Sequence, residues 1–241
     1  MKVLEIKEVQ KHFGGIKAVE NFSLDVDEGE IIGLIGPNGA GKSTLFNCVA
    51  GVHPPTSGEI VFLGERTGGL RPWDLCRKGL ARTFQIVKPF ASRSVLYNVM
   101  VGAFAVTTRR SDAEKRAMDV LHHLRMEGLK DACAGNLTIA DRKRLEIARA
   151  LATRPKLLLL DEVMAGLRPT EVDEMVAIIK RLREAGMTIF VIEHIMRAIM
   201  ALSDRIAVLH FGSKIAEGTP QQISRDERVI KAYLGEDYGA A

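Results

Sequence analysis

Hydrophobic and polar residues follow two different patterns along the chain. They alternate through the first thirty positions, as in Phe22-Ser23-Leu24-Asp25-Val26, and this period of two predicts β-strands with one buried face. The pair Gly14-Gly15 lies between two such runs and predicts a turn that joins antiparallel strands. Residues 31–35, 157–160 and 188–192 are instead almost continuously apolar, which is typical of parallel strands buried on both faces.

The period changes to that of a helix from about residue 94 to residue 152. Within this stretch Ser111 and Glu114 have the spacing of a capping box, so we expect a helix with Ser111 as its N-cap. Further along the chain short apolar strands alternate with helical segments, including a helix expected to begin near Pro169 and to end at Gly186. This alternation predicts a sheet covered by helices on both faces.

A glycine-rich stretch directly follows the apolar run 31–35. It reads Gly36-Pro37-Asn38-Gly39-Ala40-Gly41-Lys42-Ser43-Thr44 and precedes a helix-like segment, which is the context of a phosphate-binding loop. Glycines allow successive backbone N–H groups to point at phosphate oxygens, and the helix adds the positive end of its dipole. Lys42 would then contact the outer phosphates and Ser43 would bind Mg²⁺. The stretch predicts nucleotide binding.

Together these patterns predict the fold class. We expect an α/β protein with a P-loop NTPase core and a mostly parallel sheet, an N-terminal antiparallel β-subdomain and a helical insertion subdomain. The chain would form one domain over residues 1–241. Residues 1–85 and 155–241 would form the core with its antiparallel part, and residues 86–154 would form the helical subdomain.

Two adjacent carboxylates, Asp161 and Glu162, end the apolar run 157–160. Parallel sheets bind ligands at the carboxyl ends of their strands, where the phosphate-binding loop also lies. Because neighbouring side chains of a strand point to opposite faces, the two carboxylates are expected to have different roles. Asp161 would hold Mg²⁺ through water, and Glu162 would orient the water that attacks the γ-phosphate.

Three further residues are candidates for the same site. Gln85 closes a strand in the segment Arg82-Thr83-Phe84-Gln85, and its neutral amide would bind Mg²⁺ or the attacking water. His194 follows the run 188–192, whose strand should lie beside the one ending at Asp161, so His194 would contact the γ-phosphate. Phe13 lies in the early hairpin, where it would stack on adenine or fill the core.

Composition narrows the class of protein only modestly. The 241 residues are 46% hydrophobic and 27% charged, with a net charge of +4, as in an ordinary globular protein. No apolar run approaches the roughly 18 residues of a membrane span, and the first residues do not resemble a signal peptide. The three cysteines lie far apart without metal-binding spacing, so we expect a cytoplasmic protein with reduced thiols.

A basic run, Arg142-Lys143-Arg144, lies in the last predicted helix of the 94–152 stretch. It lacks the interleaved aromatic residues of a nucleic-acid-binding strip, and the charge of the chain is nearly balanced. We therefore interpret the run as a solvated helix face and expect no nucleic acid partner.

These residues together resemble the ATP-binding subunit of an ABC transporter over essentially the whole chain. The resemblance implies that Phe13 stacks on adenine, Gly36 to Thr44 form the Walker A loop, Gln85 is the Q-loop residue, Asp161 and Glu162 are the Walker B pair and His194 is the switch histidine. Further segments resemble the branched-chain amino acid importer subfamily: Ala81-Arg82-Thr83-Phe84-Gln85, Arg144-Leu145-Glu146-Ile147-Ala148-Arg149-Ala150-Leu151, Ala165-Gly166-Leu167, Val191-Ile192-Glu193-His194 and Tyr233-Leu234-Gly235-Glu236-Asp237.

Two segments depart from the family pattern. Leu137-Thr138-Ile139-Ala140-Asp141 occupies the place of the family signature Leu-Ser-Gly-Gly-Gln, which closes over the γ-phosphate bound by the opposite protomer. Thr138 keeps the hydroxyl and would cap the following helix, whereas Asp141 adds negative charge near a polyanion. Arg168 stands where the family usually has aspartate or asparagine.

The resemblance implies an ATPase subunit on the cytoplasmic face of the cell membrane, which uses ATP and Mg²⁺ to energise import of branched-chain or related hydrophobic amino acids. Its implied partners are separate transmembrane permease subunits, a second ATPase subunit, identical or paralogous, and indirectly an extracytoplasmic substrate-binding protein. Two alternatives remain open. One is an ATPase for lipid or lipopolysaccharide export, and the other is a soluble ABC-type ATPase or nucleotide switch without membrane partners.

Overall fold

The computed structural model describes residues 1–234. The segment Tyr233-Leu234-Gly235-Glu236-Asp237, which carries part of the resemblance, therefore lies outside the described residues from position 235 onward. In residues 1–234 no helix is long and apolar enough to cross a membrane.

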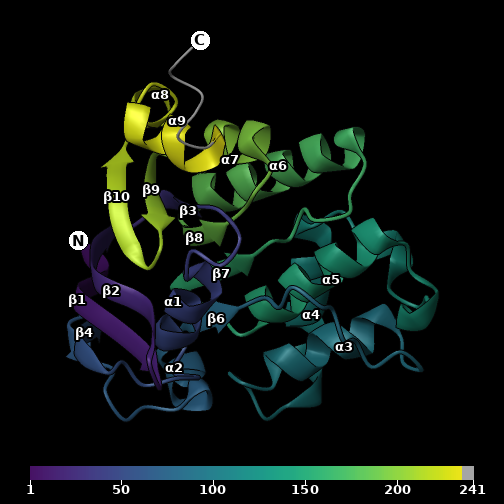
Figure 1. Ribbon diagram of the computed structural model, residues 1–241. Helices are drawn as coiled ribbons and strands as arrows, with labels where there is room; N and C mark the ends of the chain where they lie inside the picture. The colour runs from purple at the N-terminus through teal and green to yellow at the C-terminus, as the bar shows by residue number, and fades with distance from the viewer. Residues whose placement is uncertain (235–241) are drawn as a thin grey trace.

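An antiparallel sheet of four strands contains most of the N-terminal residues. Its order is β2-β1-β4-β5, and the alternating runs form the two long strands joined at Gly14-Gly15, as predicted. The strands are β1 (Lys2–Phe13), β2 (Ile16–Asp27), β4 (Ser57–Phe62) and β5 (Glu65–Arg66). Figure 1 shows this sheet, in purple and blue, at one side of the molecule.

A second sheet of six strands has the order β10-β9-β3-β8-β7-β6. Among the described strands of this second sheet, only β10 runs antiparallel to its neighbour, so the prediction of a mostly parallel sheet is confirmed. The strands are β3 (Ile31–Ile35), β6 (Leu80–Arg82), β7 (Leu157–Asp161), β8 (Thr188–Ile192), β9 (Arg205–His210) and β10 (Ser213–Gly218). Each of β3, β7 and β8 is buried at every position, as their continuous apolar composition predicts.

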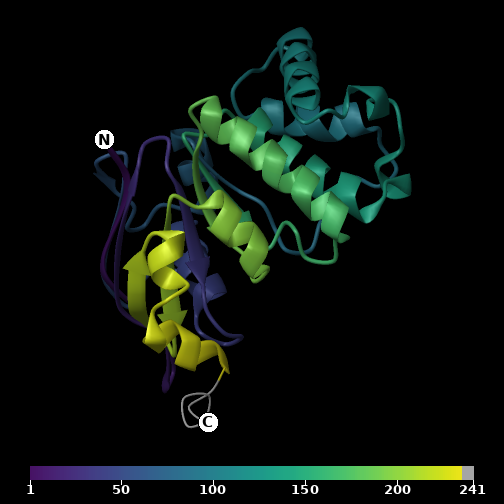
Figure 2. The same ribbon diagram turned by 90° about the horizontal axis from the view of Figure 1, so that it is seen from above.

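Helices cover both faces of the parallel sheet. One apolar core lies between the two sheets and includes Leu45 and Phe46 of α1, and a second lies on the opposite face. Figure 2 shows α3, α4 and α5 gathered at the side away from the N-terminal strands. The helices are α1 (Lys42–Val49), α2 (Pro72–Lys78), α3 (Val95–Ala103), α4 (Arg110–His123), α5 (Ile139–Ala152), α6 (Pro169–Glu184), α7 (Met196–Leu202), α8 (Pro220–Ile223) and α9 (Glu227–Leu234), with short 3₁₀ turns η1 (Glu127–Leu129) and η2 (Ala134–Asn136).

Two local predictions were wrong. Helix α4 begins one residue before Ser111, so the Ser111 hydroxyl lies inside the first turn and does not cap the helix within the described chain. Strand β6 ends at Arg82, and Gln85 lies in the loop beyond it. Thr83 still donates its N–H to the carbonyl oxygen of Leu159 at 2.9 Å, and the main chain leaves the sheet after this bond.

Candidate nucleotide site

Four neighbouring parallel strands end at one edge of the sheet, and each is followed by a predicted site residue. The glycine-rich loop follows β3, Gln85 follows β6, Asp161 ends β7, and His194 follows β8. Strand β8 pairs with β7 in a register that places Ile192 opposite Asp161, as the sequence predicted for neighbouring strands. Loops far apart in the sequence therefore meet at one place (Figure 1).

The glycine-rich loop is packed so closely that side chains are excluded at two of its positions. A Cβ atom at Gly36 would lie 2.1 Å from the carbonyl oxygen of Leu209. Gly41 has a φ of +104°, and a Cβ there would lie 2.2 Å from the carbonyl oxygen of Ala18. The turn between β9 and β10 also holds the loop from behind, because Gly212 donates its N–H to the Ala40 carbonyl oxygen at 3.0 Å.

Lys42 begins α1 and is buried beneath the loop. Its ammonium group donates to the carbonyl oxygens of Gly36 at 2.6 Å and Pro37 at 3.0 Å, which draws the two ends of the loop together. Burial lowers the pKa of Lys42, and the nearby carboxylates of Glu162 and Asp161 oppose this shift. A buried cation next to open backbone N–H groups is suited to bind a phosphate chain.

A cavity of about 430 Å³ lies over this loop. Its lining comes from the loop, from the start of β2, from Glu162 and from the β9–β10 turn. Among the described residues, Ile16 and Ala18 line the cavity but Phe13 does not. The Phe13 ring is 44% exposed and packs edge-on against His53, with ring centroids 5.4 Å apart. Stacking of Phe13 on adenine therefore stays a prediction.

Glu162 lies at the centre of the site, with Gln85 and His194 beside it. The Gln85 amide donates to Oε2 of Glu162 at 2.7 Å, and Nδ1 of His194 lies 3.9 Å from the same oxygen. Glu162 has a φ of +49°, an uncommon conformation for a residue with a side chain. The structure thus brings together three predicted residues whose side chains point at a common space beside the phosphate loop.

Asp161 is buried and is held by a basic residue that the sequence prediction did not include. The Arg82 guanidinium donates to Oδ2 of Asp161 at 2.7 Å and to the side-chain oxygen of Asn47 at 2.6 Å. Asp161, Ser43 and Gln85 all line one further cavity of about 520 Å³. A carboxylate, a hydroxyl and an amide oxygen are the ligand types that Mg²⁺ prefers, so the three predicted residues fit this ion.

The segment in the place of the family signature begins α5. Thr138 caps this helix, as predicted, because its Oγ1 accepts the N–H of Asp141 at 3.1 Å. The same hydroxyl donates to Oδ2 of Asp141 at 2.7 Å. Ile139 is 60% exposed beside them. The first turn of α5 therefore carries its own carboxylate, bonded within the segment.

Arg168 is an exposed residue that precedes α6. Its guanidinium donates to Oε1 of Glu171 at 2.8 Å, and its backbone N–H donates to Oε2 of the same carboxylate, also at 2.8 Å. Arg168 thus forms a local pair with its own helix.

Two buried charged residues near the site were missed. Lys143, interpreted from the sequence as part of a solvated basic run, is only 6% exposed, so that interpretation is wrong for this residue. Glu193, between β8 and His194, is fully buried. The residues one turn away from Lys143, Ala140 and Ile147, are apolar and indicate a buried helix face. The basic run masked this signal, since such a run on a helix is usually solvated.

Comparison with known proteins decides the family. Residues 19–165, more than half of the chain, match the family model described as ABC transporter. The chain belongs to this family. Residues 213–239 of this ABC ATPase also match a model described as branched-chain amino acid ATP-binding cassette transporter.

Several curated proteins are similar to this ABC ATPase over nearly their whole length. It is 40% identical to the high-affinity branched-chain amino acid transport ATP-binding protein BraF of Pseudomonas aeruginosa, covering 97% of this chain and 98% of BraF. The identity to LivG of Escherichia coli K12, which has the same description, is also 40%, again covering 97% and 98%. The lipopolysaccharide export system ATP-binding protein LptB of E. coli K12 is 38% identical, with 99% of each chain covered.

Solved structures agree with this assignment. A nucleotide-free ATP-binding cassette from an ABC transporter matches with a TM-score of 0.89 at 30% identity, covering 98% of this chain and 100% of the other. A structure of an ATP-binding cassette in its ADP conformation gives the same values. The fold is that of an ATP-binding cassette, and the chain is a nucleotide-binding ATPase of the transporter family.

Proposed function

We propose that this ATPase energises the import of branched-chain or related hydrophobic amino acids, as the peripheral subunit of a membrane transporter. The observation that carries the proposal is the 40% identity, over 97% of the chain, to two amino acid transport subunits. The match of residues 213–239 to a branched-chain amino acid cassette model supports it further. Lipopolysaccharide export is the second candidate, because 38% identity to an export subunit is nearly as high.

ATP would bind over the glycine-rich loop. The backbone N–H groups of the loop and the N-terminus of α1 would surround the phosphates, and Lys42 would place its charge on the outer ones. Ser43, Gln85 and Asp161 would hold Mg²⁺, whose chemistry when bound is to neutralise charge on the β- and γ-phosphates. Arg82 would keep the Asp161 carboxylate in a fixed orientation through the 2.7 Å hydrogen bond already present.

Glu162 would act on the attacking water. Its Oε2 already accepts a hydrogen bond from Gln85 at 2.7 Å, and a water replacing or sharing that donor would be oriented toward the γ-phosphate. His194, 53% exposed at its side chain, would contact the γ-phosphate from the neighbouring strand end. Loss of the phosphate would remove that contact and release the loop.

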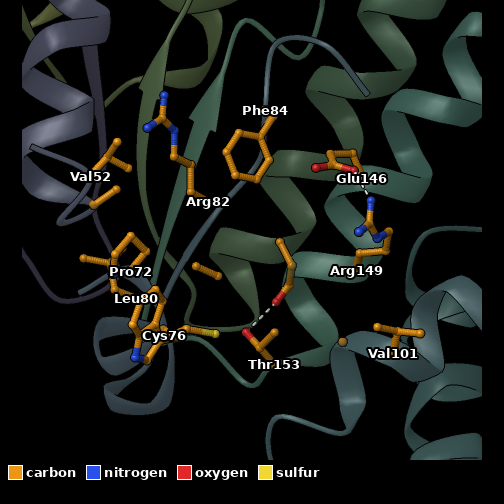
Figure 3. Close-up of a pocket in the computed structure, with 15 residues that line it drawn as sticks. Val52, Pro72, Cys76, Leu80, Arg82, Phe84, Val101, Glu146, Arg149 and Thr153 are labelled. Carbon is orange, nitrogen blue, oxygen red and sulfur yellow. Dashed lines mark hydrogen bonds and ion pairs between the residues drawn. The ribbon is translucent and has the colours of Figure 1, made fainter. Parts of the chain in front are cut away.

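A membrane subunit would dock in a groove between the core and the helical part. The groove has a volume of about 420 Å³ and is lined mainly by apolar groups, with Arg82 on one side of Phe84 and Glu146 and Arg149 on the other (Figure 3). Trp73, Phe84 and Val101 on its walls are 52%, 57% and 37% exposed, which is unusual for side chains of this size. An apolar helical segment of a permease, carrying a few polar residues, would cover them.

A second ATPase subunit would complete the transporter. A solved ATP-binding cassette, 27% identical and matching with a TM-score of 0.80 over 90% of this chain, is described as a dimer bound to ADP and phosphate. By analogy two subunits would enclose two ATP molecules. Because Asp141 and Ile139 stand in place of signature residues, we infer a paralogous partner rather than an identical one.

Purification of this chain from mildly solubilised native membranes, followed by mass spectrometry, tests the proposal. We expect two polytopic membrane proteins, a second ATPase and an extracytoplasmic amino acid-binding protein. Recovery of lipopolysaccharide-export subunits would replace import with export. Recovery in the soluble fraction alone would exclude both and favour a nucleotide switch.

A variant pair tests the groove in the same experiment. Val101→Glu places a charge on the groove wall and should abolish recovery of the membrane proteins while ATP still binds. Val106→Glu is the matched control, because Val106 is similarly exposed, at 44%, but is not part of the groove lining among the described residues. Equal recovery with both variants would place the docking surface elsewhere.

A further inference from the structure

Beneath the nucleotide site lie two charged side chains that the proposed mechanism does not use. Lys143 comes from the second turn of α5 and is 6% exposed, and Glu193 follows β8 and is 0% exposed. Charged groups are rarely buried to this degree unless polar partners replace the lost water. The partners of both side chains are main-chain groups of the loops that carry the site.

Lys143 connects α5 to two site residues at once. Its ammonium group donates to the carbonyl oxygen of Gln85 at 3.0 Å and to that of Glu162 at 3.1 Å. The side chains of these same two residues are hydrogen-bonded to each other at 2.7 Å. One cation from the helical part therefore fixes the backbone of both members of the pair proposed to orient water.

Glu193 connects the loops on the other side of Glu162. Its Oε1 accepts the backbone N–H of Met164, two residues beyond Glu162, at 2.8 Å. Its Oε2 is buried and has no hydrogen-bond partner among the described residues. Burial raises the pKa of Glu193 to about 7, although the nearby backbone N–H groups of Met164 and His194 oppose this shift.

The two charges influence each other although they do not touch. No ion pair within 4.0 Å joins them in residues 1–234. Burial lowers the pKa of Lys143, and Glu193 is the carboxylate that opposes this lowering most, ahead of Glu162. Removing one charge would leave the other buried with less compensation, whereas removing both would not.

We propose that Lys143 and Glu193 are a pair of positioning residues for ATP hydrolysis, which hold the loops of Gln85, Glu162 and His194 in their catalytic arrangement and link that arrangement to α5. The link is short, since Lys143 lies five residues after Thr138 on one continuous helix. A displacement of the start of α5 by a partner subunit would move the Lys143 ammonium and with it the backbone of Gln85 and Glu162. The inference rests on the proposed role of Glu162.

Steady-state ATPase kinetics of the full-length chain, assembled with its membrane partners, test the pair. Lys143→Met should lower kcat about 30- to 100-fold and leave the ATP dissociation constant within threefold of the wild-type value. Lys143→Gln keeps one donor and should recover at least tenfold of that loss. The double variant Lys143→Met with Glu193→Gln should turn over faster than Lys143→Met alone, because the unpaired carboxylate is gone.

Arg142→Met is the matched control, since Arg142 is the exposed neighbour of Lys143 on the same helix and should keep the wild-type kcat. Wild-type kcat in Lys143→Met would overturn the inference. So would an equal loss of kcat and ATP affinity in Lys143→Met and Lys143→Gln, which indicates a structural role only. If Lys143→Met does not fold, wild-type kcat in both Lys143→Gln and Glu193→Gln overturns it.

Glu162→Gln separates this inference from the function on which it rests. If Glu162→Gln stops turnover while Lys143→Met does not, the positioning pair is wrong and the role of Glu162 stands. If Glu162→Gln turns over at the wild-type rate, the role of Glu162 is wrong and the positioning pair is rejected with it.

Discussion

The N-termini of α1 and α5 differ in whether the chain itself supplies a cap and a negative charge. Helix α1 begins after Gly41, and within residues 1–234 no side chain caps it and no acidic residue lies in its first turn. Helix α5 is capped by the Thr138 hydroxyl and has Asp141 in its first turn. A helix N-terminus attracts an anion, and α5 already has one whereas α1 does not.

The comparison shows that a helix N-terminus can bind a ligand only if the chain leaves its backbone N–H groups uncapped. At α1 the glycine-rich loop replaces side chains with bare backbone, and Lys42 is held back by two carbonyl oxygens. At α5 the chain satisfies its own N–H groups, which stabilises the helix and removes the attraction for phosphate. A phosphate-binding end thus gives up local stability that an ordinary end retains.

Glu162→Gln separates binding at the α1 end from hydrolysis and should have the largest effect. Gln retains the size of Glu but cannot act as a base, so turnover should fall at least about 100-fold. ATP affinity should stay within a fewfold of the wild-type value, because the phosphates are bound by the α1 end. Phosphate release and equilibrium ATP binding measure the two quantities; a parallel loss of both would show that Glu162 shapes the binding surface itself.

Lys42→Ala tests phosphate binding at the uncapped N-terminus of α1. Loss of a charged hydrogen bond to phosphate costs about 2–3 kcal/mol, so ATP affinity should weaken about 30- to 150-fold. Lys180→Ala, at an exposed position of α6, is the matched control and should bind ATP normally. Titration calorimetry compares the three chains, and unchanged affinity in Lys42→Ala would contradict the assignment of the loop.

Glu193→Gln tests whether the buried Glu193 carboxyl makes the stability of the fold depend on pH. Glu193 has a pKa of about 7 in the fold and an ordinary value of 4.5, so the folded chain binds its proton more tightly than the unfolded chain. The resulting stability is complete below about pH 4.5 and is lost as pH rises through about 7. Urea unfolding should show wild-type stability falling relative to Glu193→Gln by about 3 kcal/mol at most between pH 5 and 8. A constant difference would mean that Glu193 titrates normally.

Thr138→Ala tests the capped N-terminus of α5 and should have the smallest effect of these substitutions. Loss of the N-cap should lower the free energy of unfolding by about 1 kcal/mol without changing ATP affinity. Ser111→Ala is the control, since Ser111 lies within the first turn of α4 without capping it, and it should change stability by less than about 0.5 kcal/mol. Equal losses in both variants would restore Ser111 as a cap.

The sequence predicted those parts of the site that depend on local pattern. Gly36 to Thr44 carry the spacing of a phosphate-binding loop between an apolar strand and a helix, and the apolar strand before Asp161 predicted its place at the sheet edge. Ser111 was misplaced because a one-residue shift of the helix start turns a cap into an interior residue.

Lys143 and Glu193 could not be predicted in the same way. Their roles depend on hydrogen bonds among α5 and the loops that follow β6, β7 and β8. The bonded residues lie 19 to 58 positions apart in the sequence. In the sequence, Lys143 lies between two arginines, a pattern typical of an exposed helix face. Only the folded structure shows that its ammonium group is bonded to the Gln85 carbonyl oxygen. The partners of such a buried charge depend on tertiary contacts, so they cannot be predicted from the hydrophobic periodicity of the sequence.

The open groove of Figure 3 has a consequence for how the protein is made. If a permease segment covers the groove as proposed, a chain made without that partner leaves Trp73, Phe84 and Val101 exposed to water, and exposed apolar patches favour self-association. Production of the ATPase and the proposed permease in matched amounts would then keep this surface covered.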